Sequence, residues 1–490
     1  MNKACYYLFG LKLPLYLNFA LPALIFYDYL AKLLKNRFFR ILLAFALPTI
    51  IFVRLLRNDP FFLSDDFAHL MLVSQNSYSK IVTLALRPGG IWVNHRIFVA
   101  FWAFKAIYDL FGTKVVPYLA VSYLVQIANV YLFYSVLKKI KNNSILPLIT
   151  AVIFSSFYLT WISNLHEIIA GTFVLLSLFF WTKFLERGRN LYYWLVIIFY
   201  PLTFLSKEIA FLTAPALLFY TVFYNNYVKK VEVRKIVKAF IPIFIVFLFY
   251  FLFFASSFLV YSRLPKEEGY RMAFGLPLFF KNLLSYTSML LPVLKNSYLR
   301  FLLFAALAVF IDLRKKKLVA LGLFASYVLL ITPPSLFETR SSNYYTYIPS
   351  IFFFILLFVI FDETYLRFKR FYVSTTPAAK VLKVYSLILI LVGVFGLNRI
   401  LLDNCFLIQH PWPKPYKQAF LSLVERIDEK LAKGQIKEGA LIQLDKKEQV
   451  PELEYYLYEE VLGPFLKSKE SRNFRFRYLP DKVALLVEKR

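Results

Sequence analysis

Apolar runs alternate with short polar turns along most of this chain. The first long run is Phe39–Leu56, and similar runs recur as far as residue 397. A helix of about 20 predominantly apolar residues can cross a bilayer. The pattern predicts an α-helical polytopic membrane protein with about eleven transmembrane helices, using that length as the guide. The ten runs after the first are 117–137, 144–161, 167–184, 191–206, 209–225, 238–260, 299–313, 317–332, 345–362 and 379–397.

Basic residues gather in alternate turns between these runs. Because cytoplasmic loops carry an excess of Lys and Arg, this alternation predicts that those turns are cytoplasmic. The N-terminus is then inside and the C-terminus outside, and the remaining polar stretches fall on the outer face. The basic turns are Lys138–Lys141, Lys183–Arg189, Lys229–Lys238, Arg314–Lys317 and Arg367–Arg370.

The pattern divides the chain into three segments. Residues 1–38 contain an apolar stretch, Leu13–Ala31, that is interrupted by Pro14 and Pro22, which predicts an interfacial helix or an extra membrane helix. Residues 39–400 form the transmembrane domain, whose first external loop is 58–116. Residues 401–490 lose the long apolar runs and predict a small extracytoplasmic α/β domain.

Within the first external loop we predict two helices. Residues 66–86 fit one amphipathic helix, which ends at an Arg-Pro-Gly-Gly break. Residues 92–111 are apolar enough to cross, but a crossing there would reverse the side of Lys138–Lys141. We therefore expect a juxtamembrane helix along the outer surface. In the C-terminal segment we expect helices at 416–432 and 451–466 and strands at 440–445, 474–478 and 483–487.

Composition agrees with a membrane protein. The chain is 59% hydrophobic, with a mean hydropathy of +0.59 and a formal net charge of +29. The basic residues are spread over short turns instead of one soluble face, so we do not expect a nucleic-acid partner. Cys5 and Cys405 lie far apart and predict neither a disulfide framework nor a zinc site.

Asp65 and Asp66 stand just beyond the first predicted span. Carboxylates next to hydrocarbon are costly and often functional, although Ser64 capping a short helix would account for one of them. If a helix begins here, His69 lies on the same face. One carboxylate could act as a general base on a sugar hydroxyl. Alternatively, Asp65, Asp66 and His69 could hold a divalent cation.

Further candidates are polar residues near the outer ends of spans. Lys207 either forms a structural ion pair with Glu208 or neutralises a lipid-linked phosphate. Arg340 suits phosphate recognition, whereas the nearby tyrosines also fit an interfacial aromatic belt. Trp161, Asn164, His166 and Glu167 form another outer cluster, which we expect to be a solvated helix end. The remaining candidates for binding a lipid phosphate are Arg87, His95, Tyr345 and Tyr347.

Four motifs in this order resemble the GT-C glycosyltransferases that use polyprenyl-phosphate sugars, particularly the protein O-mannosyltransferase and aminoarabinose-transferase-like group. They are Asp65-Asp66-Phe67 after an outward span, a long external loop with an Arg-Pro and Leu110-Phe111-Gly112, Leu205-Ser206-Lys207-Glu208, and Tyr345-Thr346-Tyr347-Ile348-Pro349-Ser350. The resemblance covers roughly residues 39–397. Tyr344 stands where the family has an arginine, and the nearest arginine is Arg340.

The resemblance implies a multi-pass enzyme of a prokaryotic cytoplasmic membrane, with its active site on the outer face. Asp65 or Asp66 would deprotonate or orient the acceptor hydroxyl, and Lys207 and Arg340, with Arg87, would steady the departing polyprenyl phosphate. The acceptor would be a protein, a lipid or a glycan, and the remaining partners are membrane lipids. A polysaccharide polymerase or ligase that uses lipid-linked sugars is the nearest alternative, followed by a transporter.

Overall fold

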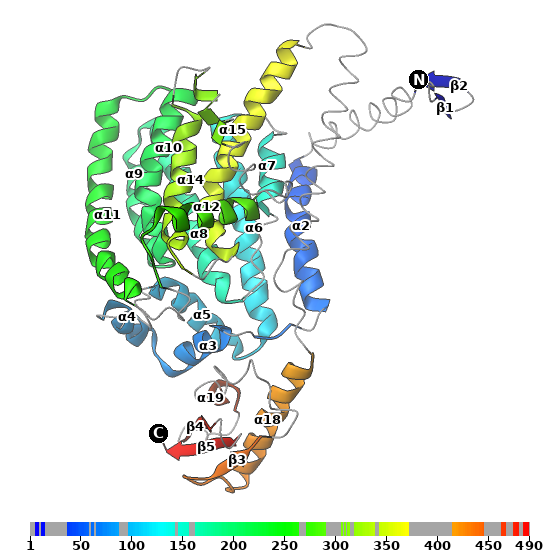
Figure 1. The fold of residues 1–490 in the computed structure, drawn as a ribbon, viewed down its shortest axis with the longest axis vertical. Helices are drawn as coiled ribbons and strands as arrows, with labels where there is room; N and C mark the ends of the chain where they lie inside the picture. Colours follow the sequence, from blue (N-terminus) through cyan, green and yellow to red (C-terminus); the bar gives the residue numbers. More distant parts are fainter. Residues whose placement is uncertain are drawn as a thin grey trace.

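The computed structural model describes a bundle of helices with shorter helices and a small sheet at one end (Figure 1). The described residues are 5–8, 11–14, 37–57, 60–62, 65–87, 97–142, 146–155, 162–263, 271–290, 305–306, 308–309, 311–313, 318–338, 343–371, 414–444, 462–466, 474–479 and 484–489. The expected helix at 13–31 and the last expected span, 379–397, lie almost wholly outside them, as does most of 299–313.

Four described helical segments are long and apolar enough to cross a membrane. They are Val115–Ile140 (α6), Ile162–Arg187 (η1 and α8), Val233–Leu252 of α11 (Val233–Ser262) and Tyr344–Glu363 of η3 and α15 (Tyr347–Phe371). Shorter bundle helices are α2 (Arg37–Arg57), α7 (Leu146–Ser155), α9 (Asn190–Phe204), α10 (Thr213–Tyr227) and α14 (Ala320–Ser335). These elements support a helical membrane fold, whereas the number of eleven crossings stays a prediction.

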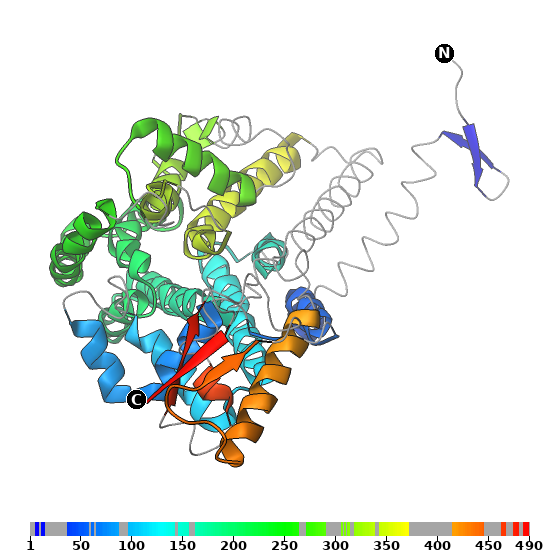
Figure 2. The ribbon, with the colours of Figure 1, turned by 60° about the horizontal axis from the view of Figure 1, so that its bottom comes forward.

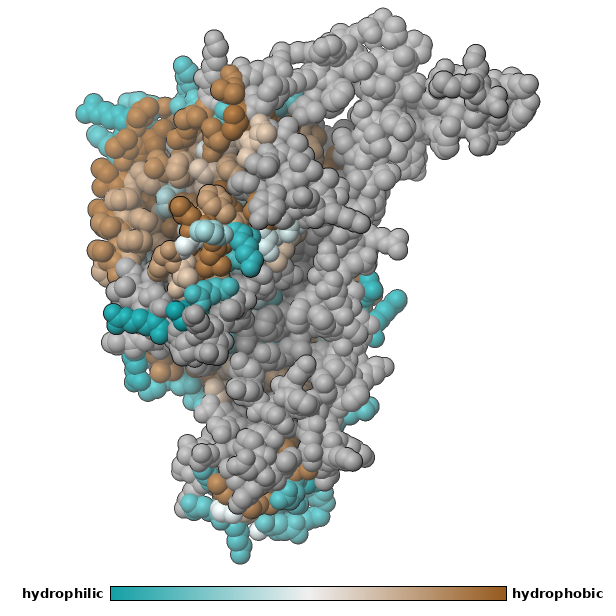
Figure 3. All heavy atoms as spheres, in the orientation of Figure 1, coloured by the Kyte–Doolittle hydropathy of each residue, from teal (hydrophilic) through white to brown (hydrophobic). Residues whose placement is uncertain are grey.

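The bundle has a central helix and a helix on its flank. Of the apolar window that covers η3 and the first part of α15, 94% of the residues are buried, compared with 28% of the window in α11. Phe249 of α11 is 75% exposed. Figure 3 shows apolar residues, in brown, over this flank, with hydrophilic residues above and below. A helix with such a face suits contact with lipid.

Short helices cover one end of the bundle. The expected single helix at 66–86 is wrong, because α3 (Asp65–Gln75) ends and α4 (Tyr78–Leu86) begins after a break. Asn76 donates to the Leu72 carbonyl at 2.8 Å and Ser77 caps α4 by accepting from the Lys80 amide, so local side-chain hydrogen bonds interrupt the helix. The helix α5 (Phe98–Phe111) has 14 residues, fewer than a crossing needs.

A further helix was not predicted. No helix was predicted between the runs 238–260 and 299–313, but α12 (Leu276–Leu290) lies there. Its Asn282 amide donates to the carbonyls of Ser335 and Phe337 at 3.0 and 2.8 Å. These bonds attach α12 to the end of α14 and satisfy carbonyls that the helix end leaves without partners.

The C-terminal elements lie beside the short helices. Helix α18 (Lys414–Ala432) and the short α19 (Leu462–Phe465) accompany the antiparallel strands β3 (Leu441–Gln443), β4 (Phe474–Leu479) and β5 (Ala484–Lys489), in the order β3-β5-β4. The three expected strands are thus present, as is the first expected helix. Figure 2 shows these strands, in orange and red, in front of the bundle end. At the other terminus, β1 (Cys5–Leu8) and β2 (Leu11–Pro14) pair as a hairpin that the sequence pattern did not predict.

Aromatic side chains join the C-terminal elements to the segment around Asp66. Phe465 lies 5.9 Å from Phe67 and 6.0 Å from Phe62 between ring centroids, and Phe420 lies 5.5 Å from Phe67. We call Phe61, Phe62, Phe67, Phe420 and Phe465 the aromatic junction. Each such ring pair contributes about 0.5–1.5 kcal/mol beyond its buried area.

The opposite end of the bundle gathers basic turns. Lys139 pairs with Glu186 at 2.9 Å, and Lys229 donates to the Glu186 carbonyl at 3.0 Å. Lys141 pairs with Asp362. The turns 138–141, 183–189 and 229–238 therefore lie at one end, as the sequence predicts, and we call it the basic end.

Candidate active site

Three short 3₁₀ helices lie at the end of the bundle away from the basic turns. They are η1 (Ile162–Asn164), η2 (Glu208–Leu212) and η3 (Asn343–Thr346), which lead directly into α8, α10 and α15. Such 3₁₀ turns are common at helix N-termini, and here three of them lie at the same end of the bundle. Irregular backbone at membrane depth is tolerated where protein buries it or where it lines a wet cavity.

Asp66 joins α3 to the first of these 3₁₀ helices. It is 1% exposed, and its Oδ1 accepts from the Ser163 amide at 2.6 Å and from the Ser163 hydroxyl. Asp66 is therefore held by a donor from η1, and its role extends beyond capping α3.

His69 follows one turn later on α3 and carries the contact to α8. Its ring packs edge-on against Phe101 and Phe104 of α5, with centroids 5.1 and 5.0 Å away. The ring of His166, in the first turn of α8, lies 6.0 Å from that of His69. The imidazoles of His69 and His166 thus lie between the Asp65-Asp66 motif and Lys207.

Lys207 is the last residue before η2. Its Nζ lies 3.0 Å from Oε1 of Glu167 and 3.0 Å from Nε2 of His166. The Lys207 side chain is 8% exposed and that of Glu167 is 0% exposed. Burying two charges is costly, but removing one partner alone costs more, so the pair fixes both side chains.

Two tyrosines of η3 also lie close to the Lys207 ammonium. Lys207 Nζ lies 5.6 Å from the centroid of the Tyr345 ring and 5.9 Å from that of Tyr344. Cation–π attraction adds to the ion pair in such a desolvated position. Both tyrosines are buried, so their interpretation as part of an interfacial belt is wrong.

Tyr347 lies in a separate layer inside the bundle. Its hydroxyl donates to Gln126 Oε1 at 2.5 Å and accepts from Asn129 Nδ2 at 2.9 Å, and Asn129 also donates to the Ile168 carbonyl. A Cβ added at Gly171 would come within 2.5 Å of Tyr347 Cε1. Tyr347 thus joins α6, α8 and α15 immediately beside the Lys207–Glu167 pair.

The other residues that the sequence predicted for the site differ in where the structure places them. Glu208 is buried at the start of η2, and Lys207 forms an ion pair with Glu167. Arg87 is exposed at the C-terminal cap of α4. Arg340, His95 and the side chain of Asp65 lie outside the described residues. Among the side chains that are described, no group of three His, Cys, Asp or Glu residues is placed to hold a metal ion.

His166 and Glu167 are site residues that the sequence did not identify. Both were expected at a solvated helix end, and the burial of Glu167 shows that this expectation was wrong. A signal was present, because Glu167 is an acidic residue at the start of a long apolar run. Its pairing with Lys207 brings together residues that are far apart in sequence, which no local pattern reports.

Comparison with protein families adds a finding about the middle of the chain. Residues 95–261 match the model of the dolichyl-phosphate-mannose-protein mannosyltransferase family. The GT-C resemblance inferred from the sequence is thereby confirmed over this stretch. Searches of curated proteins and of solved structures gave no match.

The matched stretch contains the centre of the candidate site. It includes His166, Glu167 and Lys207, whereas the acidic motif precedes it and η3 follows it. The match supports a membrane glycosyltransferase that uses a polyprenyl-phosphate sugar donor. The structure then adds Tyr344 and Tyr345 beside Lys207 and holds Asp66 against η1, which leads into α8.

Proposed function

We propose that this protein transfers a sugar from a polyprenyl-phosphate donor to an acceptor hydroxyl at the extracytoplasmic face of the membrane. The observation that carries the proposal is the convergence of Asp66, His166 and Lys207 at one end of the bundle. These residues come from separate elements, and the family match supports the donor class.

The reaction needs a proton acceptor and a cation. The acceptor oxygen attacks the anomeric carbon of the sugar while the bond from that carbon to the phosphate oxygen breaks. The hydroxyl proton passes to a carboxylate of the Asp65-Asp66 motif, and polyprenyl phosphate departs with the bonding electrons. General-base help of this kind contributes about 10²–10⁴-fold to a rate.

Lys207 is the cation for the departing phosphate in this proposal. A donor that is fixed before the reaction stabilises developing charge at no reorganisation cost. Glu167 and His166 fix the ammonium from one side, and the rings of Tyr344 and Tyr345 lie within 6 Å of it. Arg340 and Arg87, on segments next to η3 and α4, are proposed as further phosphate contacts.

The orientation in the membrane follows from charge. Lys139, Lys141 and Lys183 lie at the end opposite the candidate site. By the positive-inside rule we propose that this end is cytoplasmic and that the site is outside. Labelling with a membrane-impermeant thiol reagent tests this, using Lys114→Cys near the site and Arg189→Cys at the basic end. We expect labelling of intact cells at position 114 alone; labelling at position 189 alone would overturn the orientation.

The catalytic assignment is tested by Asp65→Asn and Asp66→Asn. Asparagine at position 66 still offers an oxygen to Ser163, so α3 should keep its place. We expect at least one variant to lose about 10²–10⁴-fold in transfer. The measurement is transfer of label from polyprenyl-phosphate mannose and from a polyprenyl-phosphate pentose to membrane acceptors.

The matched control is Asp109→Asn, in an exposed pair with Lys105. Full activity in both variants and in their double would exclude the motif from catalysis.

A further inference from the structure

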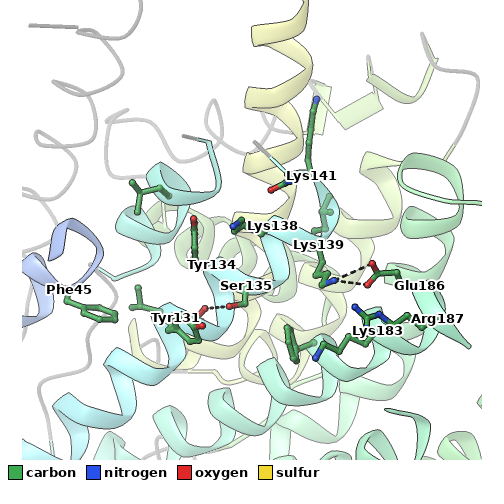
Figure 4. Close-up of a pocket in the computed structure, with 15 residues that line it drawn as sticks. Phe45, Tyr131, Tyr134, Ser135, Lys138, Lys139, Lys141, Lys183, Glu186 and Arg187 are labelled. Atoms are coloured by element: carbon green, nitrogen blue, oxygen red, sulfur yellow. Dashed lines mark hydrogen bonds and ion pairs between the residues drawn. The ribbon is translucent and has the colours of Figure 1, made fainter. Parts of the chain in front are cut away.

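A second candidate binding site lies at the basic end of the bundle. A cavity of about 720 Å³ opens there among α2, α6, α7 and α8 (Figure 4). Phe45 of α2 and Leu148 of α7 form part of its apolar wall. It is separate from the Lys207–Glu167 pair, because His166 and Glu167 lie in the first turn of α8 whereas the cavity is lined by the last part of that helix, from Phe179 to Arg187.

The two long helices present similar stripes of side chains to this cavity. On α6 the stripe is Tyr131, Tyr134 and Lys138, and on α8 it is Phe179, Lys183 and Arg187. Residues three or four apart share one face of a helix, so each stripe is continuous. On both helices the aromatic residues come first and the cations follow towards the basic end. From Tyr131 to Lys138 the helix rises about 10 Å.

The cations of the cavity divide into two groups. Lys139 pairs with Glu186, and Lys141 pairs with Asp362. Lys138, Lys183 and Arg187 have no carboxylate partner among the described residues. Lys183 Nζ lies over the rings of Phe179 and Tyr192, at 4.5 and 5.2 Å, and Lys138 Nζ lies 5.7 Å from the Tyr134 ring. Lys138 and Lys183 are thus held beside aromatic rings, and the one carboxylate among the lining residues, Glu186, pairs with Lys139.

We propose that this cavity binds an anionic phospholipid of the surrounding bilayer, with its phosphate between Lys138, Lys183 and Arg187. Cationic side chains make strong, charge-assisted hydrogen bonds with phosphate oxygens. The aromatic and apolar wall then takes the glycerol backbone and the start of an acyl chain. Tyr131 is 48% exposed on this wall, so the cavity reaches the surface of the bundle. A free anion would leave that wall without a use, and basic pockets between transmembrane helices suit anionic headgroups.

Native mass spectrometry of the delipidated, detergent-purified full chain tests the proposal. The probes are dioleoyl phosphatidylglycerol and dioleoyl phosphatidylcholine, which differ only in the headgroup. The cavity variant is Lys138→Gln, Lys183→Gln, Arg187→Gln. The control is Lys230→Gln, Lys238→Gln, Arg234→Gln, which removes the same charges from exposed positions at the same end. At about 1 kcal/mol for each cation, we expect the cavity variant to lose phosphatidylglycerol affinity by at least about tenfold. The control should change it less than twofold.

Three outcomes would overturn the proposal. Equal losses in the two triple variants would mean that only the overall charge of this end attracts lipid. Millimolar inorganic phosphate displacing the lipid would mean a site for free anions. Tighter binding of undecaprenyl phosphate than of phosphatidylglycerol would mean a site for the donor lipid instead of a bilayer phospholipid.

A second measurement keeps all the charges in place. A photo-crosslinking residue at Tyr131 samples the cavity wall, and one at Leu124 samples an exposed position elsewhere on α6. After irradiation in vesicles of equal phosphatidylglycerol and phosphatidylcholine content, we expect anionic lipid to be enriched several-fold at position 131 and not at position 124. Equal capture at the two positions would contradict the proposal even if the triple variant failed to fold.

Discussion

Each end of the bundle contains a lysine that pairs with a buried carboxylate and joins distant helices, and the two pairs differ in their surroundings. Lys141 pairs with Asp362, whose Oδ2 also accepts from the Tyr227 hydroxyl at 2.6 Å, at the C-terminal ends of α6 and α10. Lys207 pairs with Glu167 beside His166 and next to two tyrosine rings. The first arrangement satisfies a carboxylate and joins helices. The second gathers groups that can move protons and stabilise negative charge.

The backbone shows the same contrast. The described 3₁₀ helices η1, η2 and η3 all lie at the end that holds Lys207. At the basic end, Asp312 instead caps α14 by accepting from the amides of Val319, Ala320 and Leu321 at 2.7–2.8 Å. Capping of this kind stabilises a helix end. A buried ion pair alone therefore does not indicate function, and its neighbours and the local backbone distinguish the two cases.

Replacing each pair by two apolar residues should produce the largest difference. The double variants are Lys207→Met with Glu167→Met, and Lys141→Met with Asp362→Met. Apolar replacement of a buried ion pair is often neutral or stabilising, whereas loss of one partner costs about 3–5 kcal/mol. We expect both proteins to fold, with thermal melting in detergent as the measurement. Transfer from polyprenyl-phosphate sugar should fall by about 10²–10³-fold in the first variant only.

The single variants complete this experiment. Lys207→Met and Lys141→Met each leave a buried carboxylate unpaired, so both should melt earlier than their double variants. Retained transfer in the folded Lys207→Met, Glu167→Met protein would mean that both pairs are structural. The comparison between the two ends would then fail.

The second largest effect concerns the aromatic junction, which covers only the end that holds Asp66. Phe465→Ala removes a ring that contacts Phe62 and Phe67 on either side of the acidic pair. A displacement of about 1 Å in a catalytic group can cost about 100-fold in rate. We expect transfer to fall by about tenfold to a hundredfold, measured at equal amounts of folded protein. Phe249→Ala, which removes an exposed ring from α11, is the control and should leave transfer unchanged. Equal transfer in the two variants would show that the C-terminal elements do not position the motif.

The sequence predicted the long elements of the fold well and the contacts between them poorly. The runs 117–137 and 167–184 correspond to α6 and α8 within a few residues, because the length of an apolar run is a local property. Lys207 was also identified, since a cation between two apolar runs is conspicuous. Its partner Glu167 was not, because that pairing depends on packing between helices that are 40 residues apart in sequence. The break between α3 and α4 was missed because short side-chain hydrogen bonds at Asn76 and Ser77 outweigh the amphipathic pattern.

The smallest effect uses two glycines, Gly171 within α8 and Gly188 just after it, which lie towards opposite ends of the bundle. A Cβ at Gly171 would lie 2.5 Å from Tyr347 Cε1, so Gly171→Ala must displace that ring. Overpacking of this kind costs about 1–3 kcal/mol. Because Tyr347 lies on α15 just after η3, we also expect transfer to fall by a few-fold at equal amounts of folded protein.

Gly188 follows α8 with a φ of 66°, and no atom lies within 4 Å of an added Cβ. Gly188→Ala should cost about 1 kcal/mol through its left-handed backbone and leave transfer unchanged. Differential scanning fluorimetry and the transfer assay together measure both variants. A loss of transfer at Gly188 as large as at Gly171 would show that the two ends are equally coupled to the reaction.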